Sequence, residues 1–162
     1  MSHPALGLPP AQPTPLAAAA DRLLSRRDAI AARAIEIVIE IDPAFRERYD
    51  DLALRGILAD CAVHLEKLAA SLATADPGIT ARWAETVVPI YRSRRISADD
   101  FGTILEAVRT AALEELGDEM DAAQPILDAA VDAAALRLNH FRRIAGDAHK
   151  RDPLVSFLYK GA

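Results

Sequence analysis

Apolar residues recur along most of the chain at the spacing of α-helices. Between about residues 51 and 75 they step by four, three, four, three and four positions, which places them on one side of a helix. This stripe consists of Leu54, Leu58, Cys61, Leu65, Leu68 and Leu72. The pattern therefore predicts one long helix over 51–75 with a buried face.

The remaining segments also have helical patterns, separated by Pro, Gly and Asp. Isoleucines alternate with other residues over 35–41 as in a strand, but the alanine-rich approach and the lack of a pairing partner favour a helix. We expect helices over 16–41, near Phe45, over 79–94 with a kink or break at Pro89, over 97–117, and over 121–144 with Gly146 closing the last one.

Length and composition favour a single all-α domain. The 162 residues suit one domain, and 51% apolar against 27% charged residues support a buried core. Seven glycines and 5% aromatic residues are too few for a sandwich or barrel. We expect a flexible Pro-rich arm over 1–15 and one helical domain over 16–162. The apolar residues at 154–159 are expected to pack on the domain or on a partner.

Cysteine content and charge restrict the location and the partners. Cys61 is the single cysteine, which excludes an internal disulfide and a Cys-rich metal site and makes the cytoplasm the expected location. The net charge of −5 disfavours nucleic acid as a partner. The charge-free run 2–20 holds five of the ten prolines and lacks the basic opening of a secretory signal, so we expect no membrane association.

Ionisable residues form a second stripe on the predicted 51–75 helix, beside the leucine stripe. Asp60 and His64 are four residues apart, so their side chains lie on the same face. They can form an ordinary surface ion pair, or both can contact one ligand, because a carboxylate accepts several hydrogen bonds and a histidine can donate, accept or bind a metal. The spacing does not decide between these two interpretations.

Other candidate residues each have a structural and a functional interpretation. Cys61 lies in the leucine stripe and fits a small buried hydrophobe, whereas a reactive thiol needs an electropositive, partly exposed site. Trp83 and Tyr91 fit either the core or the walls of a pocket for a flat ligand. Two basic clusters are typical of solvated faces, or of clamps for carboxylates, and consist of Arg82, Arg92, Arg94, Arg95, Arg142 and Arg143. No sequence motif of catalysis is present, so we expect a protein that is not an enzyme.

The stretch from Tyr49 to Asp76, continuing to about Val108, resembles the phycobiliproteins, globin-fold proteins that hold linear tetrapyrroles. In that family a Tyr precedes the chromophore-attaching Cys by eight residues, and an Asp three residues further contacts the pyrrole nitrogens. Tyr49, Ile57 and Asp60 stand at these places. Val63 and His64 take the places of the family's tyrosine pair, and Leu65 matches the Leu that follows. Ala75 and Asp76 match the family's turn. Its next helix and turn resemble the segments Tyr91 to Ser93 and Ile96 to Ser97.

The sequence departs from the phycobiliprotein pattern at two positions, and these departures indicate which related family it resembles more. Ile57 stands where the attaching Cys belongs and cannot form a thioether, and Ala59 replaces the basic residue that usually precedes the Asp. The pattern is closer to the bilin biosynthesis-associated globins, which bind bilins and are encoded beside bilin-making enzymes. The resemblance therefore implies a globin-like helical bundle with an N-terminal helical extension. It also implies non-covalent binding of a bilin such as biliverdin, for carriage or sensing.

The resemblance also assigns the binding residues. Asp60 is expected to accept hydrogen bonds from the pyrrole N–H groups, His64 to contact a ring carbonyl or propionate, and Arg55 or the cluster at 92–95 to pair with propionates. Cys61, one turn after Ile57, is a further candidate for reaching a vinyl carbon. Bilin-synthesis enzymes and a second copy, paired through residues 16–41, are the implied protein partners.

Two other functions share this fold. A haem globin needs an axial ligand, and the helix expected at 79–94 holds no histidine, which leaves His64 or His140. A non-haem globin-like sensor or dimerisation module needs no ligand, and the apolar tail and alanine-rich first helix suit it. Spectra with biliverdin and with haem separate the three functions.

Overall fold

The structure is a computed structural model that describes residues 14–151, and every secondary-structure element within them is helical. The elements are α1 (Pro15–Ser25), α2 (Arg27–Ile41), α3 (Phe45–Arg48), α4 (Asp51–Thr74), α5 (Gly78–Ser93), α6 (Ala98–Leu116), the 3-10 helix η1 (Gly117–Glu119) and α7 (Met120–Arg151). The all-α prediction is confirmed for this part of the chain. No helix in it is long and apolar enough to cross a membrane.

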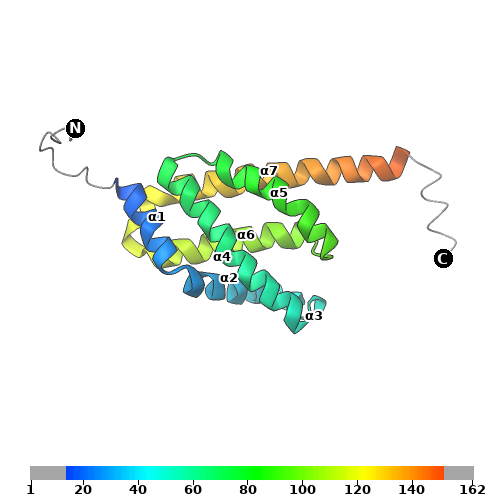
Figure 1. Cartoon of the computed structure of the whole chain (residues 1–162), viewed down its shortest axis with the longest axis horizontal. Helices are drawn as coiled ribbons and strands as arrows, with labels where there is room; N and C mark the ends of the chain where they lie inside the picture. Colours follow the sequence, from blue (N-terminus) through cyan, green and yellow to red (C-terminus); the bar gives the residue numbers. More distant parts are fainter. Residues whose placement is uncertain (1–13, 152–162) are drawn as a thin grey trace, which may run out of the picture.

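Helix α4 crosses the bundle diagonally and contacts α1, α2, α5, α6 and α7 (Figure 1). Helix α5 packs along α7, and α2 packs along α6. One hydrophobic cluster joins the long helices, with Phe45, Phe101 and Leu65 among its fully buried side chains. Helix α4 therefore gives the other helices a common surface, and its contact with α5 forms the part of the core that matters for the site.

The single helix expected over 16–41 is wrong, because the chain breaks between α1 and α2. Arg26 leaves the helical conformation, with φ −112° and ψ 16°, and the Ser25 hydroxyl donates to the carbonyl of Arg22 at 2.7 Å. A serine that bonds to its own backbone weakens a helix without any Gly or Pro. The change of direction lets α1 pack on α4 and α2 on α6 (Figure 1). The homodimer through residues 16–41 stays a prediction.

Helices α4 and α6 begin and end close to the predicted residues. The carboxylate of Asp50 accepts from the Ala53 N–H at 2.8 Å, and the Ser97 hydroxyl accepts from the Asp100 N–H at 3.0 Å. Gly117 closes α6 with a φ of 52°, a conformation that costs glycine little. One detail of the stripe is wrong: Leu58 is 39% exposed, because the covered side of this part of α4 runs through Ile57 and Cys61 instead.

The helix predicted over 79–94 is confirmed as α5, which does not break at Pro89, while the alternative of a kink there stays a prediction. The helix end predicted at Gly146 is wrong, because α7 continues through this residue to Arg151. Glycine permits a helix end but does not impose one, and it costs a helix interior only about 1 kcal/mol relative to alanine. The arm expected over 1–15 lies outside the described residues except for Thr14, which caps α1, and Pro15, its first residue. The tail at 154–159 also lies outside them.

A polar cluster fixes the start of α6 against the junction of α3 and α4. The carboxylate of Asp100 accepts from the hydroxyl of Tyr49, and from Nη2 of Arg48 at 2.7 Å. Arg48 also donates to Asp42 at 2.6 Å. Burial, together with the hydrogen bond to Asp100, raises the pKa of Tyr49 to about 12. The first turn of α6, which forms one wall of the site described below, is thereby held in place.

Helix α4 ends with alanine in a left-handed conformation that favours glycine. Ala75 has φ 52° and ψ 35°. We expect Ala75→Gly to raise the free energy of unfolding by about 1 kcal/mol, because glycine escapes the Cβ clash of that conformation. Denaturant unfolding measures the change. Ala32→Gly, at an exposed position inside α2, is the control and is expected to lower the free energy by about 1 kcal/mol. Equal changes in the two variants would contradict this.

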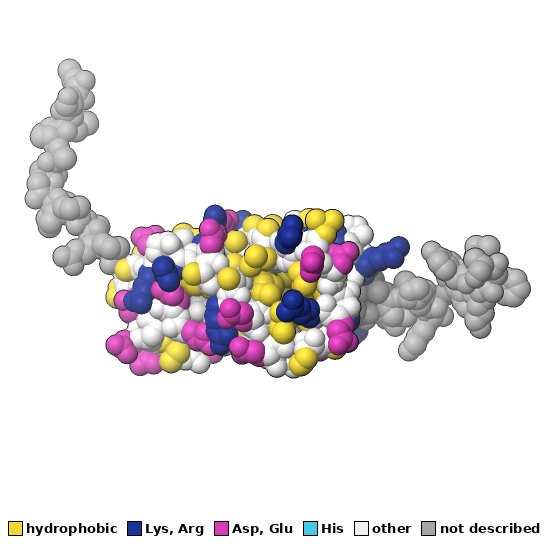
Figure 2. Space-filling view, turned by 90° about the horizontal axis from the view of Figure 1, so that it is seen from below, with side chains coloured by type: hydrophobic (Ala, Val, Ile, Leu, Met, Phe, Trp, Pro, Cys, Tyr) yellow, Lys and Arg dark blue, Asp and Glu magenta, His cyan; other side chains and the backbone are white. Residues whose placement is uncertain are grey.

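Charges of both signs are mixed on the face shown in Figure 2, around a hydrophobic area in its middle. Ion pairs also join neighbouring helices, for example Arg33 with Glu114 at 2.9 Å and Arg27 with Glu66 at 2.6 Å. This face has no continuous basic patch of the kind that nucleic acid requires.

Candidate functional site

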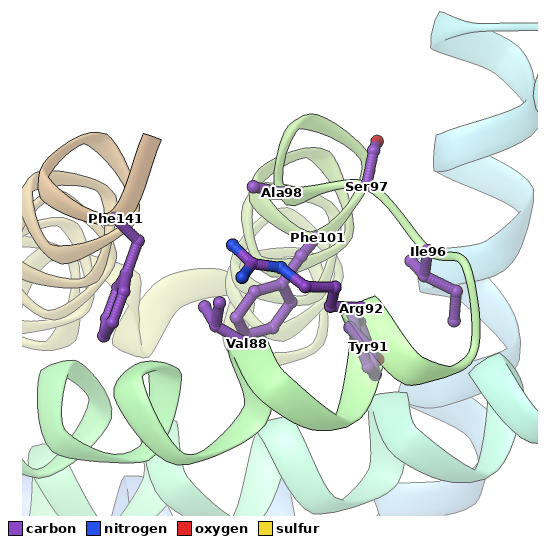
Figure 3. A pocket seen from close by; sticks show the side chains of 8 residues that line it. All are labelled: Val88, Tyr91, Arg92, Ile96, Ser97, Ala98, Phe101 and Phe141. Atoms are coloured by element: carbon purple, nitrogen blue, oxygen red, sulfur yellow. The ribbon is translucent and has the colours of Figure 1, made fainter. Parts of the chain in front are cut away.

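An apolar cavity of about 300 Å³ lies where the end of α5 meets the start of α6 and the side of α7. Its walls are mostly aliphatic and aromatic, and Arg92 supplies the charge (Figure 3). The lining residues are Val88, Tyr91, Arg92, Ile96, Ser97, Ala98, Phe101 and Phe141. Ligand sites are typically concave and apolar with a few polar groups, and this cavity has that composition.

A second cavity of about 300 Å³ adjoins the first. The two share Val88, Arg92 and Phe141, and the second adds Pro89 and Ser93 of α5. We call the two cavities together the α5–α7 groove. Because they share part of their lining, one ligand could occupy both.

Arg92 is the charged side chain of the groove and has no ion-pair partner among the described residues. Figure 3 shows it extending from α5 across the space between Phe141 of α7 and Ala98 at the start of α6. Many other arginines are paired, including Arg94 with Asp60 at 2.6 Å. A guanidinium beside an apolar surface binds carboxylates and phosphates well, because it offers several N–H donors in one plane.

A buried hydrogen-bonded chain lies behind the groove, between α4 and α5. His64 is 1% exposed, and its Nδ1 accepts from the indole N–H of Trp83 at 2.9 Å. Because an indole nitrogen only donates, Nδ1 carries no proton, and the proton of the neutral ring is on Nε2. Nε2 then donates to the hydroxyl of Tyr91 at 2.8 Å. Burial, with the charge of Arg94 acting in the same direction, lowers the pKa of His64 to about 3, so the ring is neutral at pH 7.

Tyr91 joins this chain to the groove. Its ring lines the cavity and meets the ring of Phe101 edge-on, with centroids 4.9 Å apart. Its oxygen accepts from His64, which leaves its own O–H to point elsewhere, and the negative charge of Asp60 acts on it from nearby. Burial, followed by the negative charge of Asp60, raises the pKa of Tyr91 above its usual value. The hydroxyl therefore stays protonated.

Arg94 completes the chain at the protein surface. Its Nη1 donates to Asp60 at 2.6 Å, and its guanidinium lies 5.4 Å from the centroid of the Tyr91 ring. The guanidinium also crosses α4 at Gly56, where a Cβ atom would lie 2.6 Å from Nη2. The glycine therefore makes room for the arginine that holds Asp60.

The structure brings part of the predicted site together. The surface ion pair between Asp60 and His64, one of the two interpretations of their spacing, does not form: Asp60 pairs with Arg94, while Trp83 and Tyr91 occupy both ring nitrogens of His64. Trp83 is partly buried and also makes a cation–π contact with Lys67, whose Nζ lies over the indole ring, 5.1 Å from its centre. Tyr91 is 2% exposed and reaches both the buried chain and the groove.

The other predicted residues lie apart from the groove. Ile57 and Cys61 are both 0% exposed and belong to the hydrophobic core, as the leucine stripe predicts for Cys61. Burial, with the nearby Asp60 charge, raises the pKa of the Cys61 thiol to about 12, which makes it unreactive. Arg55 is exposed on α4 and does not line the groove.

The sequence prediction missed most of the groove wall. Ala98 and Phe101 lie at the start of α6 and Phe141 lies on α7, and no helical spacing rule joins these positions to the end of α5. The sequence contained one weak signal for this site, because Arg92 belongs to a basic cluster that fits either a solvated face or a clamp for carboxylates. Within residues 14–151 no cluster of three His, Cys, Asp or Glu side chains is arranged to hold a metal ion.

No protein-family model matches the chain, and no curated protein matches it. A function for this protein must therefore be argued from its residues and its geometry.

Proposed function

We propose that the protein binds an elongated, largely apolar small molecule bearing a carboxylate in the α5–α7 groove, without catalysis, and that a linear tetrapyrrole such as biliverdin is this ligand. One observation carries the proposal. Arg92 stands in an apolar hollow without a protein carboxylate as partner among the described residues. A ligand with an apolar body and an anionic group would satisfy both features of the groove.

A linear tetrapyrrole has the required chemistry. Its rings have flat, largely hydrocarbon faces with N–H and carbonyl groups at their edges, and its propionate groups are anionic. Phe101 and Phe141 offer aromatic surfaces to flat rings, and Arg92 can donate two parallel hydrogen bonds to one propionate. The two adjoining cavities of about 300 Å³ each suit an extended molecule better than a compact one.

The proposed position of the ligand differs from the position that the resemblance implies. Asp60 and His64 lie behind Tyr91 and are already hydrogen-bonded to other side chains. In the proposed complex, Tyr91 contacts the ligand and the two polar residues support Tyr91. The kinship to the bilin-binding globins is part of the same proposal, supported by the fact that the matched residues lie mainly on α4 and α5, which contact each other.

A haem-binding globin is a less favourable alternative. Axial ligation requires an imidazole nitrogen with a free lone pair. His64 uses Nδ1 to accept from Trp83, and its Nε2 proton is directed to Tyr91. Haem binding at this residue would break both hydrogen bonds.

Titration with biliverdin tests the proposal. We expect the wild-type protein to red-shift and intensify the long-wavelength absorption band of biliverdin, and Arg92→Ala to weaken binding about tenfold, which corresponds to the loss of one charge-assisted hydrogen-bonded contact. Arg46→Ala is the matched control, because Arg46 is an exposed arginine on α3 outside the groove.

Three results would count against the proposal. Equal affinities of the wild type and Arg92→Ala for biliverdin would show that Arg92 does not bind the ligand. A sharp Soret band with haem, and no response to biliverdin, would favour the haem globin. No response to either compound would favour a sensor or dimerisation module without a tetrapyrrole.

A further inference from the structure

The α5–α7 groove lies near the point where α7 leaves the bundle. Phe141 forms one wall of the groove, and α7 continues for ten residues beyond it, projecting past the ends of α5 and α6 (Figure 1). At a rise of about 1.5 Å per residue, the end of α7 at Arg151 is about 15 Å from Phe141. The chain beyond Arg151 therefore starts close to an apolar hollow.

The chain that follows has the chemistry to occupy this hollow. Residues 152–162, which we call the C-terminal segment, lie outside the described residues and contain Leu154, Val155, Phe157, Leu158 and Tyr159. An extended chain covers about 3.3 Å per residue, so Phe157 is within about 20 Å of Arg151 and Lys160 within about 30 Å. The segment is thus long enough for its aromatic residues to return to Phe141.

We propose that the C-terminal segment folds back along α7 and docks its apolar residues, Phe157 to Tyr159, in the α5–α7 groove of the same chain. Docking buries apolar side chains of the segment against Val88, Phe101 and Phe141, and removes an apolar hollow from water. The segment is tethered, so its local concentration at the groove is in the millimolar range, and weak contacts suffice for docking.

Docking would also regulate the groove. The segment and the carboxylate-bearing ligand require the same walls, so binding of one excludes the other. This consequence rests on the proposed function, whereas docking itself does not. A ligand therefore has to displace the segment, and its apparent affinity is the intrinsic affinity multiplied by the undocked fraction.

Disulfide cross-linking in the full-length chain tests the docking directly. Lys160→Cys is combined with Ser93→Cys in the groove, and for comparison with Leu136→Cys on α7. Leu136 is 71% exposed and lies about 140° around α7 from Phe141, so it is a tethered position outside the groove. Cys61 does not interfere, because its thiol is fully buried. Oxidised glutathione starts the reaction, and mass spectrometry under non-reducing conditions measures the intramolecular disulfide.

We expect the Ser93 pair to cross-link at least about tenfold faster than the Leu136 pair, reflecting a higher local concentration in the groove. Adding Phe157→Asp and Leu158→Asp should lower the cross-linking rate of the Ser93 pair to that of the Leu136 pair. Equal rates of the two pairs would overturn the proposal, as would a fast rate that the aspartates leave unchanged. Disulfide-linked dimers as the main product would overturn it in favour of docking between two copies.

Biliverdin separates this proposal from the proposed function. If both hold, saturating biliverdin slows cross-linking of the Ser93 pair. If biliverdin does not bind, the proposed function fails while the fast cross-linking remains.

Discussion

His64→Ala is expected to lower the free energy of unfolding by about 4 kcal/mol. Removing the imidazole leaves a cavity at a site that is 1% exposed and takes away the partners of the Trp83 N–H and the Tyr91 hydroxyl. Cavity formation alone costs about 2–5 kcal/mol for a large buried side chain, and each orphaned polar group adds about 1–3 kcal/mol where water cannot reach it. The lower part of these ranges applies because Trp83 is partly exposed and can find water.

Denaturant unfolding monitored by circular dichroism measures this change. His140→Ala is the matched control, because His140 is exposed on α7, and it should change the free energy by less than about 0.5 kcal/mol. A loss below about 1 kcal/mol in His64→Ala would contradict the buried chain described here. Trp83 fluorescence gives a second measurement, since the indole loses its hydrogen-bond acceptor.

Acid is expected to destabilise the protein through the same residue. The pKa of His64 is lowered to about 3 in the folded state, mainly by burial, against about 6.5 in the unfolded chain. At pH values between these two pKa values, His64 therefore binds a proton in the unfolded state but not in the folded state. This contribution is fully present above about pH 6.5 and is lost as the pH falls toward 3, at up to about 1.4 kcal/mol per pH unit.

Unfolding free energies at several pH values between 4.5 and 7 measure this effect. His64→Gln keeps a donor and an acceptor but cannot take up a proton, so its stability should depend less on pH than that of the wild type. Carboxylates titrate in both proteins, and the difference between the two curves isolates the histidine. His140→Gln should follow the wild-type curve. Parallel curves for the wild type and His64→Gln would show that His64 is accessible to protons in the folded protein.

The sequence predicted well those features that depend on neighbours in the chain. Helix α6 begins after Ser97 as expected, because a short polar side chain bonds to an N–H three residues away. The burial of Cys61 and Leu65 follows from their helical spacing. These predictions need only local geometry.

The features that the sequence did not predict depend on packing between distant segments. The break at Arg26 has no Gly or Pro, and it accompanies a change of direction after which α2 packs along α6 as well as on α4. The partners of His64 lie 19 and 27 residues away on α5, so helical spacing suggested Asp60 instead. The groove joins Val88 to Phe141 across three helices, and only the folded chain brings them together.

The contact between Gly56 and Arg94 links two positions that lie on different helices. A Cβ atom at position 56 would lie 2.6 Å from Nη2 of Arg94, so a side chain there would shift the guanidinium that donates to Asp60 through Nη1. Gly56 and Arg94 are therefore coupled across α4 and α5: the size of the side chain at position 56 limits how closely the guanidinium can approach α4 beside Asp60.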